Sequence, residues 1–215
     1  MEDRIRYPEI DSFIRSLISR EKGIYKEMEE YARALFIPIV PPETAALLKV
    51  LTRIHRPQKI LEAGTAIGYS ALIMAEASDV DTRIDTIEIN EQTADIAEKN
   101  IAKLGYAKKI KVIRGDALEV MQCLTSTYDM IFLDASKGQY IEYLSECLRL
   151  TAKGGVIISD NVLYKGLVAQ DGIIVHKHRT IATRLKEYLG KLCNNPELET
   201  AVIPIGDGMA VSYRL

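Results

Sequence analysis

The sequence predicts an α/β protein whose parallel sheet is covered by helices on both faces. Beyond about residue 55, short apolar runs alternate with segments of helical periodicity. The runs are almost continuously apolar, which is typical of parallel strands buried on both faces. The chain closes with two more strand-like segments around Gly206-Asp207-Gly208, a turn suited to an antiparallel hairpin. Together these observations predict a seven-stranded, mostly parallel sheet.

Helices are expected over most of the first 55 residues. Pro8 suits a first helical turn, a second helix is expected over residues 23–35, and a third follows a proline-rich break at 36–42. The apolar residues of the first helix are spaced for one face: Ile10, Phe13, Ile14, Leu17 and Ile18. The third helix is expected to turn four side chains inward: Leu47, Leu48, Leu51 and Ile54.

The remaining chain supplies the elements of the sheet. Parallel strands are expected at residues 59–62, 82–88, 110–114, 128–134 and 155–160. Helices are expected from the first glycine turn through residue 75 and at residues 91–104, 117–124 and 139–150. A long loop, a helix near residues 180–192 and the hairpin strands 200–205 and 209–214 complete the prediction.

Length and composition predict one domain over residues 1–215, with helices over 1–55 and the α/β core over 56–215. Apolar residues make up 47% and charged residues 27%, which excludes a disordered chain. The net charge of −2 excludes a uniformly basic nucleic-acid binder. Three scattered cysteines, no signal-like apolar run and no membrane-span candidate favour a cytoplasmic protein without a membrane partner.

A glycine-containing turn, EAGTAIGYS at residues 62–70, follows the first predicted strand. Glycines allow a sharp turn into a helix and a close approach of backbone to a ligand. The spacing matches neither the dinucleotide fingerprint nor the P-loop. A tight strand-to-helix turn without any ligand remains the alternative interpretation.

Acidic residues end the second and third predicted strands. Glu88 is placed to accept hydrogen bonds from a ribose diol, and Asp116 from an adenine amino group. Each also has a structural interpretation, because an acid near a helix N-terminus interacts with the helix dipole or caps the helix. Three successive strand ends nevertheless combine into a site for an adenosyl cofactor.

Oxygen ligands end the next two strands. Asp134 follows the fourth strand, and Asp160 and Asn161 follow the fifth. Two carboxylates and an amide oxygen suit Mg²⁺. Lys137 lies three residues beyond Asp134, where it is a candidate general base. The alternatives are loop or capping acids and a solvated lysine.

Basic residues cluster in two runs. Residues 99–114 carry six basic side chains and no acid, which a solvated helix face explains. Residues 162–191 carry a net charge of +4 and directly follow the predicted metal ligands. Four of them are candidate contacts for RNA phosphates: Lys165, Lys177, Arg179 and Arg184. Tyr140 and Tyr164 could stack on a base or pack in the core.

These residues together resemble the metal-dependent O-methyltransferases of the catechol and caffeoyl-coenzyme A type. The resemblance spans essentially the whole chain and implies a Rossmann-like methyltransferase fold with extra N-terminal helices, a homodimer and S-adenosylmethionine as methyl donor. It is carried by Glu88 and by the runs EAGTAIGYS (62–70), GDA (115–117), DASK (134–137), DN (160–161) and IPIGDG (203–208).

The resemblance also implies residue roles. Glu62, Gly64, Gly68 and Ser70 would hold the amino-acid part of the cofactor, Glu88 its ribose, and Asp116 and Ala117 its adenine, with Val40 and Asp134 completing the cofactor site. The implied metal ligands are Asp134, Asp160 and Asn161, and the implied base is Lys137.

Two substrates fit such a metal site. Within the family, the runs KGQY (137–140), DNVLYKGLVA (160–169) and TAVIPIGDG (200–208) look most similar to the bacterial tRNA 5-hydroxyuridine methyltransferases. The prediction is therefore Mg²⁺-dependent methylation of 5-hydroxyuridine in tRNA anticodon loops, giving 5-methoxyuridine. The alternative substrate is a small catechol or phenylpropanoid. A nicotinamide-dependent dehydrogenase and a non-catalytic binding module are weaker alternatives, because neither explains the oxygen ligands.

Overall fold

The computed structural model describes residue 5 and residues 7–18, 23–170 and 175–215. In this part of the chain a seven-stranded sheet has the order β3-β2-β1-β4-β5-β7-β6. The first five strands are parallel, β7 is antiparallel to β5, and β6 is antiparallel to β7. The strands are β1 (Lys59–Ala63), β2 (Arg83–Glu88), β3 (Ile110–Arg114), β4 (Tyr128–Leu133), β5 (Thr151–Ser159), β6 (Leu198–Ile203) and β7 (Met209–Arg214). The predicted α/β class and the closing hairpin are confirmed.

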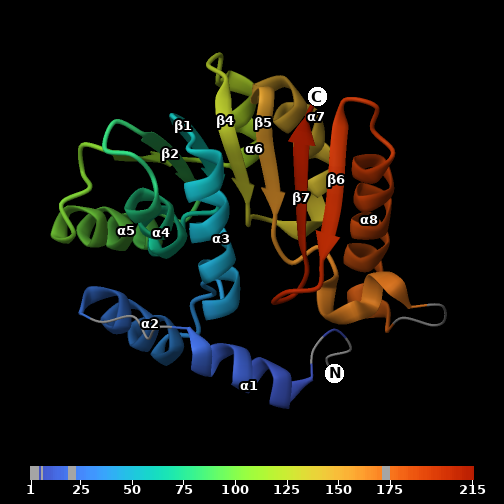
Figure 1. Cartoon of the computed structure of the whole chain (residues 1–215), viewed down its shortest axis with the longest axis horizontal. Helices are drawn as coiled ribbons and strands as arrows, with labels where there is room; N and C mark the ends of the chain where they lie inside the picture. The colour runs from blue at the N-terminus through green and yellow to red at the C-terminus, as the bar shows by residue number, and fades with distance from the viewer. Residues whose placement is uncertain (1–4, 6, 19–22, 171–174) are drawn as a thin grey trace.

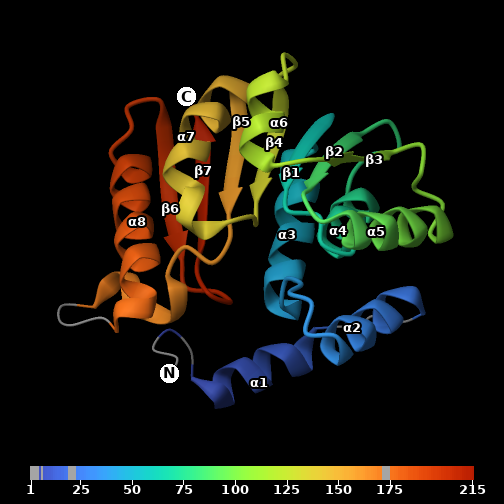
Figure 2. The same cartoon turned by 180° about the vertical axis from the view of Figure 1, so that it is seen from behind.

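Helices form a layer on each face of the sheet (Figure 1 and Figure 2). One apolar core joins α3 (Pro42–His55), α4 (Tyr69–Ala77) and α5 (Glu91–Lys103) to Ile60, Ile84 and Ile158 of the strands. The other joins α6 (Ala117–Cys123), α7 (Tyr140–Leu150) and α8 (His176–Cys193) to residues of the opposite face, such as Leu61 and Ile157. Alternate residues of each strand therefore face different cores, as period-two geometry requires.

The N-terminal helices differ from α4–α8 in how much they bury. Helix α1 (Pro8–Leu17) contains no buried residue, whereas α2 (Ile24–Ala34) buries Tyr25, Met28 and Ala32. The predicted apolar face of α1 therefore lies open in the single chain, and the homodimer expected there stays a prediction. Ile54 of α3 is 74% exposed, so its predicted inward orientation is wrong. It lies in the last turn of α3, past the last buried residue of that helix, Thr52.

Several boundaries differ from the sequence prediction for local reasons. Strand β5 begins four residues before the predicted start, because it pairs with β4 on both sides of a bulge at Gly154-Gly155 instead of beginning there. Helix α8 likewise begins at His176, before its predicted start at residue 180. The hairpin connection spans residues 204–208 and is longer than the predicted tight turn. Asp171, one of the acids in the basic run, lies outside the described residues.

The strand order reverses between β1 and β4. From β1 the chain builds outward through β2 and β3, and from β4 it builds in the other direction through β5. Helices on the two sides then diverge, so a crevice forms at the carboxyl ends of β1 and β4. In Figure 1 the ends of β4 and β5 lie at the same edge as the first turn of α8 and the 3₁₀ segment η2 (Tyr164–Ala169). No helix in the described part of the chain is long and apolar enough to cross a membrane.

Gly64→Ala is expected to destabilise the fold strongly. Gly64 has a φ of +101°, and an added Cβ would lie 2.2 Å from the Asp134 carbonyl oxygen. The backbone strain and the clash together should cost at least about 2 kcal/mol of unfolding free energy in urea titrations. Gly105→Ala is the matched control, since its φ is +79° but no atom lies within 4 Å of the added Cβ. Equal losses in the two variants would contradict the importance of the close approach.

Candidate active site

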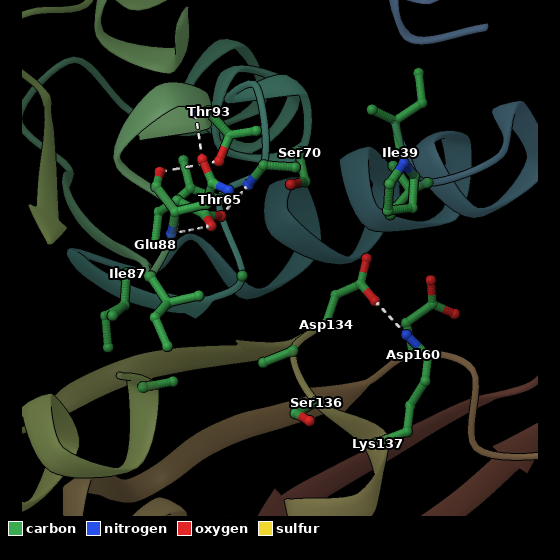
Figure 3. Close-up of a pocket in the computed structure, with 18 of the residues that line it drawn as sticks. Ile39, Thr65, Ser70, Ile87, Glu88, Thr93, Asp134, Ser136, Lys137 and Asp160 are labelled. Carbon is green, nitrogen blue, oxygen red and sulfur yellow. Dashed lines mark hydrogen bonds and ion pairs between the residues drawn. The ribbon is translucent and has the colours of Figure 1, made fainter. Parts of the chain in front are cut away.

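A cavity of about 550 Å³ occupies the crevice at the carboxyl edge of the sheet. In Figure 3, Glu88 and Thr93 lie at one end of this pocket and Asp134, Lys137 and Asp160 at the other. Ten of the predicted site residues line it: Val40, Gly64, Ser70, Glu88, Asp116, Ala117, Asp134, Lys137, Asp160 and Asn161. The structure thus brings the predicted metal residues and all the predicted cofactor residues except Glu62 and Gly68 into one pocket.

The two glycines of the first turn have different roles. Gly64 lines the cavity and lets the end of β1 lie directly against the backbone of Asp134. Gly68 does not line the cavity. It precedes α4 with a φ of +87°, and an added Cβ would lie 3.3 Å from the Cβ of Ala97 in α5. The second glycine therefore serves the close packing of α4 on α5, whereas the first shapes the pocket.

Glu62 lies beneath the pocket and does not line it. Its side chain is fully buried, and Thr86 Oγ1 donates a hydrogen bond of 2.5 Å to its carboxylate. Burial raises the pKa of Glu62 to about 8, against the opposing hydroxyls of Ser70 and Thr86. Because Ser70 does line the cavity, Glu62 is placed to act on a ligand through its neighbours and not by direct contact.

Glu88 is held rigidly at the end of β2. One carboxylate oxygen accepts a hydrogen bond from the Ala66 N–H at 2.7 Å, and the other accepts from the Asn90 N–H at 2.9 Å. The first bond ties β2 to the glycine turn, and the second begins the cap of α5. An anchored carboxylate with remaining lone pairs suits a ribose diol.

Asp116 combines its two predicted roles. Its Oδ1 accepts hydrogen bonds from the N–H groups of Leu118 and Glu119 at 2.9 and 3.2 Å, so it caps α6. It also lines the cavity together with Ala117. The structural interpretation is therefore correct, and the ligand-binding one is compatible with it.

Sequence reasoning missed much of the pocket wall. Between α2 and α3, residues 37–41 run along the cavity, yet only Val40 was predicted there. Asn90 and Thr93 line the end near Glu88, and Tyr69 and Tyr143 line other parts. A capping Asn two residues after Glu88 is a signal that could have identified Asn90. The apolar strap at 37–41 carries no comparable local signal.

The metal end of the pocket gathers two acids and one lysine. Asp134 follows β4, Asp160 follows β5, and these strands are neighbours. Lys137 Nζ lies 3.2 Å from Asp134 Oδ1, and both side chains are partly exposed. The Asn161 N–H donates to Asp160 Oδ1 at 2.8 Å. Asn161 itself has a φ of +58°, a left-handed conformation that asparagine tolerates better than most residues.

Asp134 and Asp160 lie where burial disfavours the charged form of a carboxyl group. Burial raises the pKa of Asp134, against the opposing effect of Lys137. Burial and then the negative charge of Asp134 raise the pKa of Asp160 to about 7. A buried carboxyl group at Asp160 and a partly exposed one at Asp134, beside a single lysine, favour the approach of a further cation.

The donor set fits a hard divalent cation. No group of three or more histidine, cysteine or acidic residues suited to a metal occurs among the described residues. The set here has only two acids, Asp134 and Asp160, together with Asn161, and all three residues line the cavity. Such oxygen donors are typical of Mg²⁺ sites, where water or substrate oxygens supply the remaining ligands.

The four basic residues predicted to contact RNA divide into two groups. Lys165, Lys177 and Arg179 are exposed. Arg184 instead donates to the Gly138 carbonyl oxygen and to the Glu142 carboxylate. Its guanidinium therefore ties α8 to the 3₁₀ turn η1 (Lys137–Gln139) and to α7, a structural role that the sequence did not predict.

The two tyrosines considered for base stacking also divide. Tyr140 is 1% exposed and belongs to the core, so the stacking interpretation is wrong for it. Tyr164 is partly exposed, and its hydroxyl lies 2.8 Å from His178 Nδ1. That contact links η2 to the first turn of α8.

The fold and this pocket define an α/β methyltransferase of the S-adenosylmethionine-dependent class. Residues 17–215 match the protein-family model described as O-methyltransferase, and the chain belongs to that family. The protein is thus an S-adenosylmethionine-dependent O-methyltransferase.

Known relatives cover nearly the whole chain. Caffeoyl-CoA O-methyltransferase 1 of Arabidopsis thaliana is 30% identical over 93% of this chain and 81% of its own length. A Staphylococcus aureus protein proposed to be a caffeoyl-CoA O-methyltransferase has a crystal structure with a TM-score of 0.88, 32% identity and coverage of 96% of this chain and 100% of its own. The O-methyltransferase TomG from Streptomyces achromogenes, crystallised with S-adenosylmethionine, gives a TM-score of 0.85 at 26% identity, covering 100% and 99%.

Glu62 predicts a pH-dependent stability. Its pKa is raised from 4.5 to about 8 in the folded chain, so the folded state binds this proton more tightly than the unfolded state. The resulting stabilisation is complete below about pH 4.5 and is lost as the pH rises through about 8. Glu62→Gln should remove this part of the pH dependence, which amounts to at most about 5 kcal/mol between pH 5 and pH 9. Urea unfolding at both pH values measures it, and an unchanged dependence in the variant would contradict the assignment.

Proposed function

We propose that the protein methylates a hydroxyl group that stands next to a second oxygen atom, with a divalent cation bound by Asp134, Asp160 and Asn161. The observation that carries this proposal is the pair of strand-end acids, Asp160 buried and Asp134 partly exposed, with Lys137 in the same pocket as the predicted cofactor residues. Bound Mg²⁺ would supply a Lewis acid that lowers the pKa of the substrate hydroxyl. Two adjacent substrate oxygens are the simplest way to complete its coordination.

The residues of the pocket have separate roles in the proposed reaction. Lys137, whose Nζ lies 3.2 Å from Asp134, takes up the hydroxyl proton as a neutral amine, after its ammonium group has released a proton to solvent. Ser70 and the backbone at Gly64 hold the amino-acid part of S-adenosylmethionine, Glu88 its ribose, and Asp116 with Ala117 its adenine. The apolar strap at residues 37–41 excludes water from the reacting atoms. Holding both reactants in one pocket contributes much of the acceleration.

A small catechol or phenylpropanoid is the substrate class that the relatives favour. The Arabidopsis relative is named a caffeoyl-CoA O-methyltransferase, and the apolar residues of the strap suit a flat ring. The two vicinal hydroxyls of a catechol present the required pair of oxygens. This class needs no contact with the basic residues outside the pocket.

5-Hydroxyuridine in a tRNA anticodon loop is the second candidate. Its 5-hydroxyl and neighbouring 4-carbonyl present the same pair of oxygens to the metal end. The specific observation in its favour is the group of exposed basic residues Lys165, Lys177 and Arg179 on η2 and α8. These elements lie at the edge of the sheet where β4 and β5 deliver the acids (Figure 1), so phosphates could bind beside the pocket.

Labelled S-adenosylmethionine distinguishes the two candidates. The enzyme is incubated with Mg²⁺ and either a catechol series, including caffeoyl-CoA, or hypomodified tRNA that is afterwards digested to nucleosides. Label in the methyl ether of a catechol supports the first substrate, and labelled 5-methoxyuridine supports the second. Transfer to neither, from an enzyme that binds the cofactor, would contradict the proposed pair of oxygens.

Lys137→Met is expected to lower kcat by about 10²- to 10⁴-fold, the usual contribution of a general base. Because Lys137 lies at the metal end, the affinity for S-adenosylmethionine should change little, which calorimetry can measure.

The double variant Asp160→Ala/Asn161→Ala should have a strongly reduced rate of methyl transfer, and this rate should no longer depend on the Mg²⁺ concentration. Full activity in the double variant would exclude the metal site.

Charge reversal separates the substrates further. If tRNA is the substrate, Lys177→Glu with Arg179→Glu should raise KM for tRNA by at least about tenfold, because two phosphate contacts are lost and replaced by repulsion. Methylation of a catechol by the same variant should be unchanged. Lys111→Glu is the matched control, since Lys111 is exposed on β3 at the opposite end of the strand order. An unchanged KM for tRNA would remove these residues from the RNA interface.

A further inference from the structure

Tyr140 is a buried tyrosine whose hydroxyl lies against the ends of β4 and β5. It is the first residue of α7 and directly follows the turn that carries Lys137. Its hydroxyl lies 3.1 Å from the Leu133 carbonyl oxygen and 3.0 Å from the Asp160 carbonyl oxygen. The phenol therefore bridges the carboxyl ends of β4 and β5.

The two contacts of the Tyr140 hydroxyl lie where the hydrogen-bond ladder between β4 and β5 ends. The last ladder bond between them runs from the Asp160 N–H to the Leu133 carbonyl oxygen, at 2.9 Å. One residue further on, the Asp134 N–H donates to the Ala63 carbonyl oxygen of β1, on the other side of β4, as alternation along a central strand requires. The Tyr140 hydroxyl thus bonds to the ends of both strands, at Asp160 itself and at the residue before Asp134.

The hydroxyl keeps its proton in this position. Burial, followed by the charges of Asp134 and Asp160, raises the pKa of Tyr140 well above its usual value. A protonated phenol can donate to either carbonyl oxygen and resist their separation. Edge-to-face contact with the ring of Tyr188, at 5.3 Å between centroids, holds the Tyr140 ring in place.

We propose that Tyr140 is a positioning residue whose hydroxyl sets the spacing of Asp134 and Asp160 so that both can bind one divalent cation. The inference rests on the proposed function, because it assumes that these acids hold the cation. Groups that orient metal ligands without touching the metal typically change metal affinity by about 10- to 100-fold when they are removed. Tyr140→Phe removes only the hydroxyl and keeps the ring contacts.

Tyr188 provides a matched control. It is equally buried, and its hydroxyl lies 2.6 Å from Ser159 Oγ, a side-chain contact one residue before Asp160. Tyr188→Phe therefore removes a buried tyrosine hydroxyl from the same core without opening the bridge between the two carbonyl groups. A merely structural role of Tyr140 would make the two variants alike.

The test measures Mn²⁺ binding by electron paramagnetic resonance. The affinity for S-adenosylhomocysteine and the melting temperature are measured on the same samples. Tyr140→Phe is expected to bind Mn²⁺ at least about tenfold more weakly than wild type. Its affinity for S-adenosylhomocysteine should be retained, which shows that the variant is folded. Tyr188→Phe is expected to bind Mn²⁺ like wild type even where its melting temperature falls.

Two results would overturn the inference, and they differ from each other. Wild-type Mn²⁺ affinity in Tyr140→Phe, or an equal loss in both variants, contradicts the positioning role while leaving the proposed metal site intact. Absence of Mn²⁺ binding by the wild-type protein, with S-adenosylhomocysteine still bound, contradicts the metal in the proposed function and this inference with it.

Discussion

The site depends on the close approach of two backbones at the point where the strand order reverses. The Gly64 turn at the end of β1 rests against the Asp134 carbonyl at the end of β4, with space for a hydrogen atom but not for a Cβ. The Asp134 N–H also donates to the Ala63 carbonyl oxygen, so the two strand ends are fixed relative to each other. The part of the pocket on β1 to β3, where we propose the cofactor, and the part on β4 and β5, where we propose the cation, are joined through this contact.

Around this joint the protein concentrates carboxyl groups in a poorly solvated place. Glu62, Asp134 and Asp160 all have raised pKa values because they are buried. Burying a charged carboxylate costs free energy. Hydrogen bonds and one lysine offset only part of this cost. A pocket of this kind favours positively charged ligands, and both a sulfonium cofactor and a divalent cation meet that requirement. The overall charge of −2 reveals nothing of this local concentration.

The elements beyond β5 hold the outer side of the metal end. The hairpin loop supports the segment after Asn161, since the N–H groups of Val162 and Leu163 donate to the carbonyl oxygens of Gly208 and Asp207. Arg184 in α8 fixes the turn of Lys137 by bonding to the Gly138 carbonyl oxygen. The hairpin loop and α8 therefore hold the segments that carry Asn161 and Lys137.

The sequence by itself determined the order of the elements, the seven strands, the glycine turn and ten of the residues that line the pocket. These features are local: period-two and helical patterns identify elements, and parallel strands necessarily bring their carboxyl ends to one edge. Only the tertiary structure decided that Glu62 and Gly68 lie beneath the pocket, that Arg184 pairs with Glu142, and that residues 37–41 form a wall. It also placed Tyr140 between Leu133 and Asp160. Each of these depends on contacts between residues distant in the chain, and the residue types involved have the same local pattern whether they pack, pair or bind.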